Sequence, residues 1–384
     1  MGMDFNDIFA LMVEKKGSDL FITAGMPPCM KLNGRIVPVA KTKLNEQQAR
    51  DLTQSLMSPE QRDEFHHTKE CNFAYDAKGI GRFRVSAFVQ RDNAGMVLRR
   101  IETRIPTLED LRLPPVLADL SMSKRGLVVF VGATGTGKST SLAAMVGHRN
   151  QNASGHIISI EDPIEFLHQH GNSIITQREV GVDTESYEVA LKNTLRQAPD
   201  VILIGEIRTR ETMQHAITFA ETGHLVLTTL HANNANQALE RIIHFFPDEQ
   251  HKQVLMDLSL NLRGIVAQQL VPRIDGEGRK AILEVLLNTP LASDLIAKAD
   301  VSKLKDLMKR SREQGMITFD QALYEACVAG EISEKDAMQH ADSSNEVRLM
   351  LKLGDRRPGA GAPASGAGDL GGSPPDDGMS LLPE

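Results

Sequence analysis

The segment Gly126–Thr140, GLVVFVGATGTGKST, constrains the possible fold more than any other part of the sequence. Its first half is a run of branched apolar residues, which is typical of a buried strand. The second half follows the pattern G-x-x-x-x-G-K-S/T, with glycines that let the backbone turn sharply and a helix expected directly afterwards. A strand, a glycine-rich loop and a helix in this order form a phosphate-binding unit, so the sequence predicts a nucleotide site.

We expect this loop to hold ATP and Mg²⁺. Its backbone N–H groups would converge on phosphate oxygens, helped by the positive end of the following helix dipole. Lys138 is predicted to reach the β- and γ-phosphates, and the hydroxyl of Ser139 to bind Mg²⁺. The predicted nucleotide-binding residues are Gly132, Ala133, Thr134, Gly135, Thr136, Gly137, Lys138, Ser139 and Thr140.

The pattern of apolar runs predicts an α/β unit from Gly126 onward. Short continuous apolar strands alternate with helical stretches: GLVVFVG, HIISIED, VILIGE, HLVLTTLH and AILEVLL. Such strands favour a parallel sheet covered on both faces. Helices are expected over residues 248–269 and again from Pro290 to about Met350.

The preceding residues predict a smaller α+β unit with an antiparallel sheet. A helix with Ile8, Leu11 and Met12 on one face comes first, followed by short strands around Asn33-Gly34, a strong hairpin signal. Helices are expected over residues 45–69, with a new start at Ser58-Pro59, and three alternating strands end this unit. We predict an N-terminal domain over residues 1–105, a linker over 106–123 and an ATPase domain over 124–352. Residues 353–384 are rich in Gly and Pro and are expected to be a disordered tail.

Composition argues against several classes of protein. No run of about 18 apolar residues occurs and the start lacks a signal-peptide pattern, so we expect no membrane insertion and a cytoplasmic location. Three cysteines without a C-x-x-C pair favour neither disulfides nor a zinc site. A net charge of −7 and the absence of tryptophan disfavour nucleic acid as a partner.

Acidic residues follow two of the predicted strands. Glu206 ends VILIGE, where many phosphate-loop ATPases carry an aspartate, and Glu161, Asp162 and Glu165 follow HIISI. The carboxyl ends of parallel strands face the same crevice. We therefore assign Glu206 to Mg²⁺ and its water, and Glu165 to polarising the attacking water.

Histidines and arginines are further candidates. His224 and His231 flank one predicted strand, roughly 23 Å apart along an extended chain, which excludes a shared metal ion. Arginines gather on two strands of the N-terminal unit, either as a solvated basic face or as charge-stabilising groups for the γ-phosphate. They are Arg82, Arg84, Arg91, Arg99, Arg100 and Arg104.

Four motifs, GATGTGKST, IEDPIEF, LIGEIR and GHLVLTTLHANNA, resemble in order and spacing the secretion ATPase superfamily, and within it the PilT/PilU family of type IV pilus twitching-motility ATPases. The resemblance implies a PAS-like N-terminal domain, a RecA-like ATPase domain and a homohexameric ring. It assigns Lys138 and Ser139 to the Walker A motif, Glu161, Asp162 and Glu165 to the Asp box, Glu206 to an atypical Walker B motif, and His224 and His231 to the His box. Arg82, Arg84 and Arg99 become candidate nucleotide contacts.

Two departures from the family pattern bear on function. The missing C-x-x-C favours the retraction branch, and Leu291–Lys298 lacks both arginines of the AIRNLIRE-type helix, which favours the accessory PilU branch. We expect an ATPase that assists pilus retraction together with a PilT-like ATPase and an inner-membrane platform protein, at the cytoplasmic face of the membrane. The alternatives are an ATP-binding adaptor with little turnover and a nucleic-acid translocase.

Overall fold

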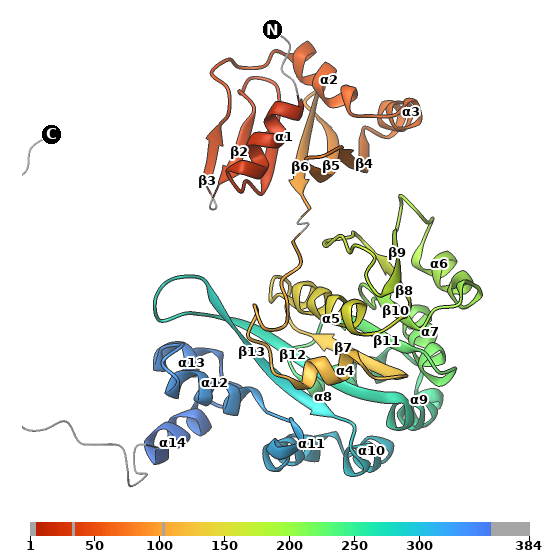
Figure 1. The fold of residues 1–384 in the computed structure, drawn as a ribbon, viewed down its shortest axis with the longest axis vertical. Helices are drawn as coiled ribbons and strands as arrows, with labels where there is room; N and C mark the ends of the chain where they lie inside the picture. The colour runs from red at the N-terminus through yellow and green to blue at the C-terminus, as the bar shows by residue number, and fades with distance from the viewer. Residues whose placement is uncertain (1–4, 33–34, 102–103, 355–384) are drawn as a thin grey trace, which may run out of the picture.

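The computed structural model describes residues 5–32, 35–101 and 104–354 (Figure 1). Within these residues two sheets form. The first sheet packs on one hydrophobic core, made of residues between Phe5 and Leu98. The second has a core on each face, and these two cores begin at Leu108 and Leu127. The predicted turn at Asn33-Gly34 and residues 355–384 of the predicted tail lie outside the described residues, whereas residues 353 and 354, also assigned to the tail, end a helix. The domain boundaries at 105/106, 123/124 and 352/353 stay predictions.

The first unit is built on an antiparallel sheet with the strand order β3-β2-β1-β6-β5-β4. Phe9 of α1 packs into its core, where its ring stacks on that of Phe83 at 4.1 Å between centroids. The predicted helix start at Ser58-Pro59 is confirmed, since Ser58 caps α3 and Pro59 is its first residue. The elements are α1 (Phe5–Glu14), β1 (Asp19–Ile22), β2 (Cys29–Leu32), β3 (Arg35–Pro38), α2 (Glu46–Ser55), α3 (Pro59–Thr68), β4 (Glu70–Ala77), β5 (Gly81–Gln90) and β6 (Asn93–Arg100).

The second unit contains a mixed sheet with the order β13-β12-β7-β11-β10-β8-β9. Its elements are α4 (Val116–Ser121), β7 (Gly126–Val131), α5 (Lys138–Asn152), β8 (Gly155–Glu161), β9 (Ser173–Glu179), α6 (Tyr187–Thr194), β10 (Val201–Ile204), α7 (Arg210–Glu221), β11 (Leu225–Leu230), α8 (Ala235–His244), α9 (Asp248–Asn261), β12 (Leu262–Pro272), β13 (Arg279–Leu287), α10 (Pro290–Ala297), α11 (Leu304–Arg310), α12 (Phe319–Val328), α13 (Glu334–His340) and α14 (Ser344–Gly354).

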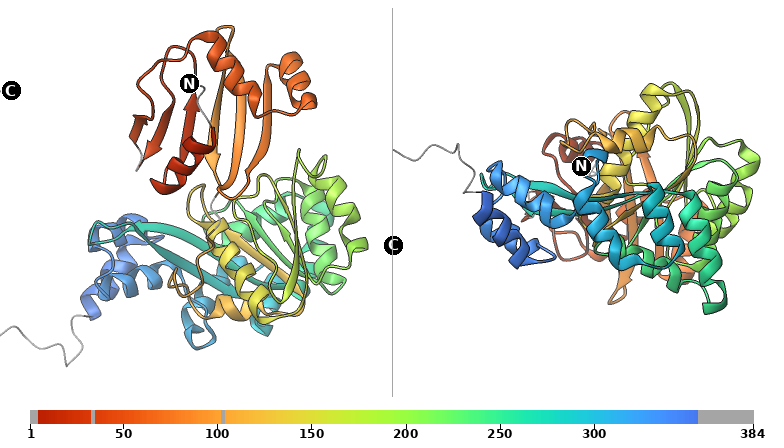
Figure 2. Two further views of the ribbon diagram at one scale, coloured as in Figure 1. Left: turned by 45° about the horizontal axis from the view of Figure 1, so that its top comes forward. Right: turned by 90° about the horizontal axis from the view of Figure 1, so that it is seen from below.

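Helices cover both faces of this sheet, as the continuous apolar strands predict (Figure 2). In β7, Leu127, Val129 and Val131 belong to one core, while Val128 and Phe130 belong to the core on the opposite face. This alternation explains why the strand has no polar side. Among the described residues, no helix is long and apolar enough to cross a membrane.

The prediction of a helix over residues 248–269 is wrong in its second half. Helix α9 ends at Asn261, and Leu262 begins β12, which pairs in parallel with β7 and antiparallel with β13. Residues such as Leu, Ala and Gln suit a helix locally, but backbone pairing with two strands decides the outcome. At Gly264 a Cβ would lie 2.9 Å from the carbonyl oxygen of Leu286, so the glycine permits this close pairing. Because β13 is antiparallel, the expectation of a wholly parallel sheet is also corrected.

Candidate functional site

Four parallel strands end at the same edge of the second sheet. The register pairs Ile204 of β10 with Ile160 of β8 and with Thr228 of β11, and Leu230 of β11 with Val131 of β7. Residues that directly follow these strands therefore converge. They line one cavity of about 520 Å³, which includes Thr134, Gly135, Gly137, Lys138, Ser139, Thr140, Glu161, Asp162, Glu165, Glu206 and His231.

The loop between β7 and α5 has the geometry that its glycines predict. Gly137 caps α5 with a φ of 84°, a left-handed conformation that disfavours any side chain. Lys138 is buried, and its Nζ donates to the carbonyl oxygens of Gly132 and Ala133, each at 2.8 Å. Burial lowers the pKa of Lys138, an effect that the nearby charges of Glu206 and Glu165 oppose. The ammonium group therefore lies between the loop and the two carboxylates.

Gln268 of β12 braces this loop, and the sequence reasoning missed it because it placed this residue in a helix. The buried side chain donates from Nε2 to the carbonyl oxygen of Thr136 at 2.8 Å and accepts from the Ser141 hydroxyl at 2.8 Å. A Cβ at Gly132 would lie 2.5 Å from the backbone oxygen of Gln268. Strand β12 thus fixes both ends of the loop.

Glu206 contacts the candidate residue His231 and also Arg208, which was not predicted. Its Oε1 lies 2.8 Å from Nε2 of His231, and its Oε2 accepts from Nε of Arg208 at 2.7 Å. Arg208 also lies 3.4 Å from Asp162, so it bridges the ends of β10 and β8. The sequence signal for Arg208 was present, since it follows Glu206 by two residues in LIGEIR.

The structure gives different surroundings to Glu161, the last residue of β8, and Glu165, which follows the strand. Glu161 accepts from the Ser159 hydroxyl at 2.6 Å and from the Gln177 amide at 3.1 Å, and burial raises its pKa, partly offset by these two hydrogen bonds. Glu165 is exposed in the cavity, on the loop that begins at Asp162. Both side chains line the cavity, with Glu165 the more exposed of the two, and the assignment of Glu165 to the attacking water stays a prediction.

The residues of the cavity fit a magnesium nucleotide. The loop backbone and Lys138 supply donors for phosphate oxygens, while Ser139 and Glu206 supply the hydroxyl and carboxylate oxygens that Mg²⁺ prefers. Leu270 and Arg279, on the β12–β13 hairpin, extend the lining beyond the loop. Gly205 lets the ends of β10 and β8 approach closely, because a Cβ there would lie 3.2 Å from the Cα of Glu161 and 3.3 Å from the carbonyl oxygen of Ile160.

Several predicted site residues lie elsewhere in this chain. His224 stands at the opposite end of β11, where its Nδ1 lies 3.1 Å from the carbonyl oxygen of Phe219. Arg99 forms an ion pair with Asp19 at 2.9 Å within the first sheet. Burial raises the pKa of Glu179 on β9, an effect that the charges of Arg82 and Arg84 partly offset. None of these three arginines lines the cavity, and their roles stay predictions.

Comparison with known proteins adds independent information. Residues 70–339 match the family described as Type II/IV secretion system protein. The chain is 69% identical over 352 residues to the type IV pilus ATPase PilU of Pseudomonas aeruginosa, covering 92% of each chain. It is 38% identical to the retraction ATPase PilT of the same organism, covering 88% of this chain and 98% of PilT. A crystal structure of the pilus retraction motor PilT with bound ADP superposes with a TM-score of 0.85 at 37% identity, covering 90% of this chain and 99% of that one.

Proposed function

The chain belongs to the PilT/PilU family of type IV pilus ATPases, within the type II/IV secretion system proteins, and from this premise we propose that it hydrolyses ATP as an accessory motor of pilus retraction. The observation that carries the proposal is the convergence of Lys138, Ser139, Glu165, Glu206 and His231 on one cavity. The similarity to PilU exceeds that to PilT, which supports an accessory role.

Each side chain has a role in this proposal. Lys138 and the loop backbone bind the β- and γ-phosphates, and Ser139 and Glu206 would hold Mg²⁺, which would supply positive charge to the phosphate oxygens. Glu165 polarises the attacking water, and His231 keeps the Glu206 carboxylate in place through their 2.8 Å contact. Arg82, Arg84, Arg99 and His224 would act at the nucleotide after a domain or a second subunit moves toward it. Such motion requires a hinge, which we place at residues 106–123.

The assembly belongs to the proposal as well. The N-terminal unit is taken as PAS-like and the second as RecA-like, and we propose a homohexamer that acts with a PilT-like ATPase and the inner-membrane platform protein, on the cytoplasmic face of the membrane at the pilus base. Nucleic acid is not among the proposed partners. The PilT structure with ADP supports a nucleotide site on this fold.

An ATP-binding adaptor with little turnover is the second candidate. It is favoured by the departure at Leu291–Lys298, which forms α10 and leaves the Leu291 side chain exposed. Buried Ala292, Leu295 and Ile296 attach this helix to the core, while Ser293 and Ala297, which stand in place of the two arginines, are only partly buried.

A turnover assay separates the two candidates. Phosphate release is measured for the purified chain alone and mixed with a PilT-like ATPase, with Lys138→Ala as the variant that lacks phosphate binding. Turnover in the chain alone that Lys138→Ala removes supports the motor. Nucleotide binding without turnover, alone or mixed, supports the adaptor. Binding that falls steeply with salt when DNA is offered would favour a translocase instead.

A further inference from the structure

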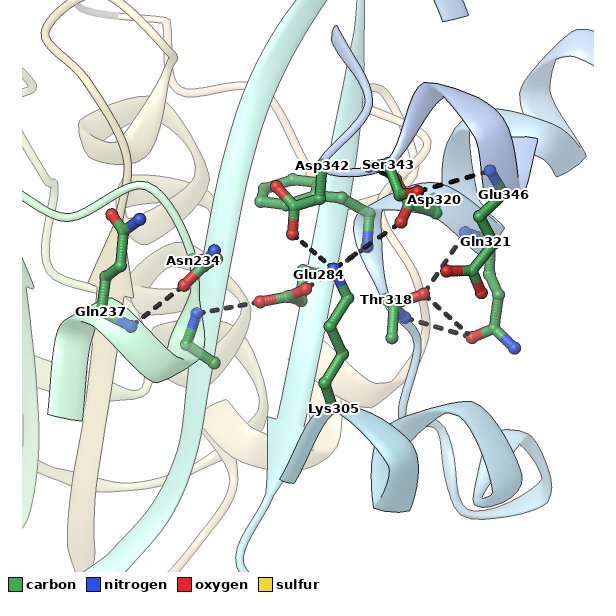
Figure 3. Close-up of polar contacts among 12 residues, drawn as sticks. Asn234, Gln237, Glu284, Lys305, Thr318, Asp320, Gln321, Asp342, Ser343 and Glu346 are labelled. Atoms are coloured by element: carbon green, nitrogen blue, oxygen red, sulfur yellow. Dashed lines mark hydrogen bonds and ion pairs between the residues drawn. The ribbon is translucent and has the colours of Figure 1, made fainter. Parts of the chain in front are cut away.

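The side chain of Glu284, on β13, lies between the first residues of two helices (Figure 3). One carboxylate oxygen accepts from the backbone N–H of Ala235 at 2.8 Å, the first residue of α8, and the other from that of Phe319 at 3.4 Å, the first residue of α12. The N–H groups in the first turn of a helix have no partner within the helix. Glu284, only 1% exposed, therefore satisfies two helices at once.

Helix α8 directly follows the loop that places His231 at the cavity. Only Ala232, Asn233 and Asn234 separate His231 from Ala235. The Asn234 side chain accepts from the N–H of Gln237 at 3.0 Å, and Glu284 supplies the second anchor of this turn. Because the connection is so short, a shift at the start of α8 moves His231 relative to Glu206.

Glu284 also lies close to Gln268, the residue that contacts the phosphate loop. In the β12–β13 register it pairs with Ala267, the neighbour of Gln268. On its other side lie the C-terminal helices, where Lys305 of α11 is 2.9 Å from Asp342 and 3.6 Å from Asp320 (Figure 3). Glu284 thus contacts both α8, which follows the loop at the cavity, and α12, which belongs to the C-terminal helices.

We propose that Glu284 is a positioning residue for ATP hydrolysis, which holds the start of α8 so that His231 keeps its contact with Glu206. A carboxylate here is costly, because burial raises the pKa of Glu284 to about 7. An apolar side chain would pack at lower cost, but it would leave the N–H groups of Ala235 and Phe319 without their partner.

The proposed role rests on ATP hydrolysis by this chain, and the test uses Glu284→Gln in the full chain. The amide of Glu284→Gln keeps the size of the carboxyl group. Only its oxygen can accept a hydrogen bond, so its nitrogen cannot replace the second acceptor. We expect kcat to fall by roughly 10- to 100-fold, as small misplacements of catalytic groups do. The Kd of a fluorescent ADP analogue should stay within about threefold, because the phosphate loop is unchanged.

Asp320→Asn is the matched control. Asp320 is also a fully buried carboxylate, and it accepts from the N–H of Ser343, but it does not touch α8. In a double-mutant cycle, Glu284→Gln should add little to the loss caused by His231→Ala, whereas Asp320→Asn should be additive. Additive losses for Glu284→Gln, or an unchanged kcat, would overturn the proposal. If Glu284→Gln fails to fold, Glu284→Asp, which keeps the charge on a shorter side chain, replaces it.

Hydrogen exchange distinguishes failure of this role from failure of the ATPase assignment. Exchange of the peptide at residues 231–244 should accelerate in Glu284→Gln and stay unchanged in Asp320→Asn. If the wild-type chain shows no turnover, the ATPase assignment fails while this measurement still reports whether Glu284 holds α8. Unchanged exchange in Glu284→Gln would contradict the positioning role directly.

Discussion

The Nε2 atom of His231 lies 2.8 Å from the Oε1 atom of Glu206. The two residues follow adjacent parallel strands, β11 and β10, and their contact closes one side of the phosphate cavity. His224, at the other end of β11, instead contacts the carbonyl oxygen of Phe219. Two histidines of one motif therefore have different surroundings within a single chain.

This difference predicts unequal effects of the two alanine variants. His231→Ala should lower kcat about tenfold or more, because Glu206 loses its partner beside the cavity. His224→Ala should leave kcat within about twofold in dilute solution, where the subunits are separate, since within one chain its side chain does not line the cavity. Steady-state phosphate release measures both. Equal losses would mean that His224 reaches a nucleotide site across a subunit boundary.

Glu206→Gln and Glu165→Gln should both bind nucleotide and turn over slowly. Removing a general base or a metal ligand typically lowers rates by about 10²–10⁴-fold, while the phosphate loop still binds ATP. Retention of radiolabelled ATP by filter binding, together with kcat, measures the two effects. Glu161→Gln is the control, since hydrogen bonds from Ser159 and Gln177 hold its carboxylate. A larger rate loss in Glu161→Gln than in Glu165→Gln would reverse the assignment.

Gln268→Ala should weaken nucleotide binding. It removes the donor to the Thr136 carbonyl oxygen and the acceptor for Ser141, and a buried polar group without a partner costs about 1–3 kcal/mol. This free-energy cost destabilises the phosphate loop. We therefore expect the Kd of ADP, measured by calorimetry, to rise by roughly 5- to 100-fold. Gln269→Ala, one residue along the strand and on its other face, should change the Kd less. If both variants raise the Kd equally, the loss comes from disturbing strand β12 and not from the hydrogen bonds of Gln268.

The buried carboxylate of Glu284 predicts a pH dependence of stability. Its pKa is about 7, raised from 4.5 by burial and by the charge of Asp342, and opposed by the Ala235 and Phe319 hydrogen bonds and by Lys305. The folded state therefore binds more protons between pH 4.5 and 7, so this group lowers stability as the pH rises through that window, by up to about 3 kcal/mol. Calorimetry at pH 5 to 8 should show the wild type losing stability relative to Glu284→Gln. A constant difference between them would contradict the burial of a titrating group.

Arg99 has a structural role within the first sheet, and a test of its role at the nucleotide must separate the two. It pairs with Asp19, which is buried, and lies opposite Arg84 in the β5–β6 register. Arg99→Ala should lower kcat more than nucleotide affinity if the side chain stabilises transferring phosphate charge. Arg91→Ala, in the turn after β5, is the surface control, and Asp19→Asn removes the ion pair but keeps the arginine. An effect of Asp19→Asn equal to that of Arg99→Ala would show that the loss is structural.

The sequence by itself determined the phosphate loop, the alternation of strands and helices, and the capped helix start at Ser58-Pro59. These features depend on neighbouring residues: the loop needs glycines, Lys138 and Ser139 within one turn of chain, and a cap needs one side chain near its own helix. It also predicted that Glu206 and the acidic residues Glu161, Asp162 and Glu165 would face one crevice with the phosphate loop, because parallel strands end at a common edge.

Only the tertiary structure decided what depends on strand order. Residues 262–269 have helical composition, yet they form β12 because β7 and β13 offer backbone partners on both sides. That pairing places Gln268 under the phosphate loop, 132 residues from Thr136, and brings Glu284 to the start of α8. That His231 lines the cavity and His224 does not likewise depends on which end of β11 meets the cavity. Contacts between residues this far apart in sequence are set by packing of the whole sheet, and no local pattern encodes them.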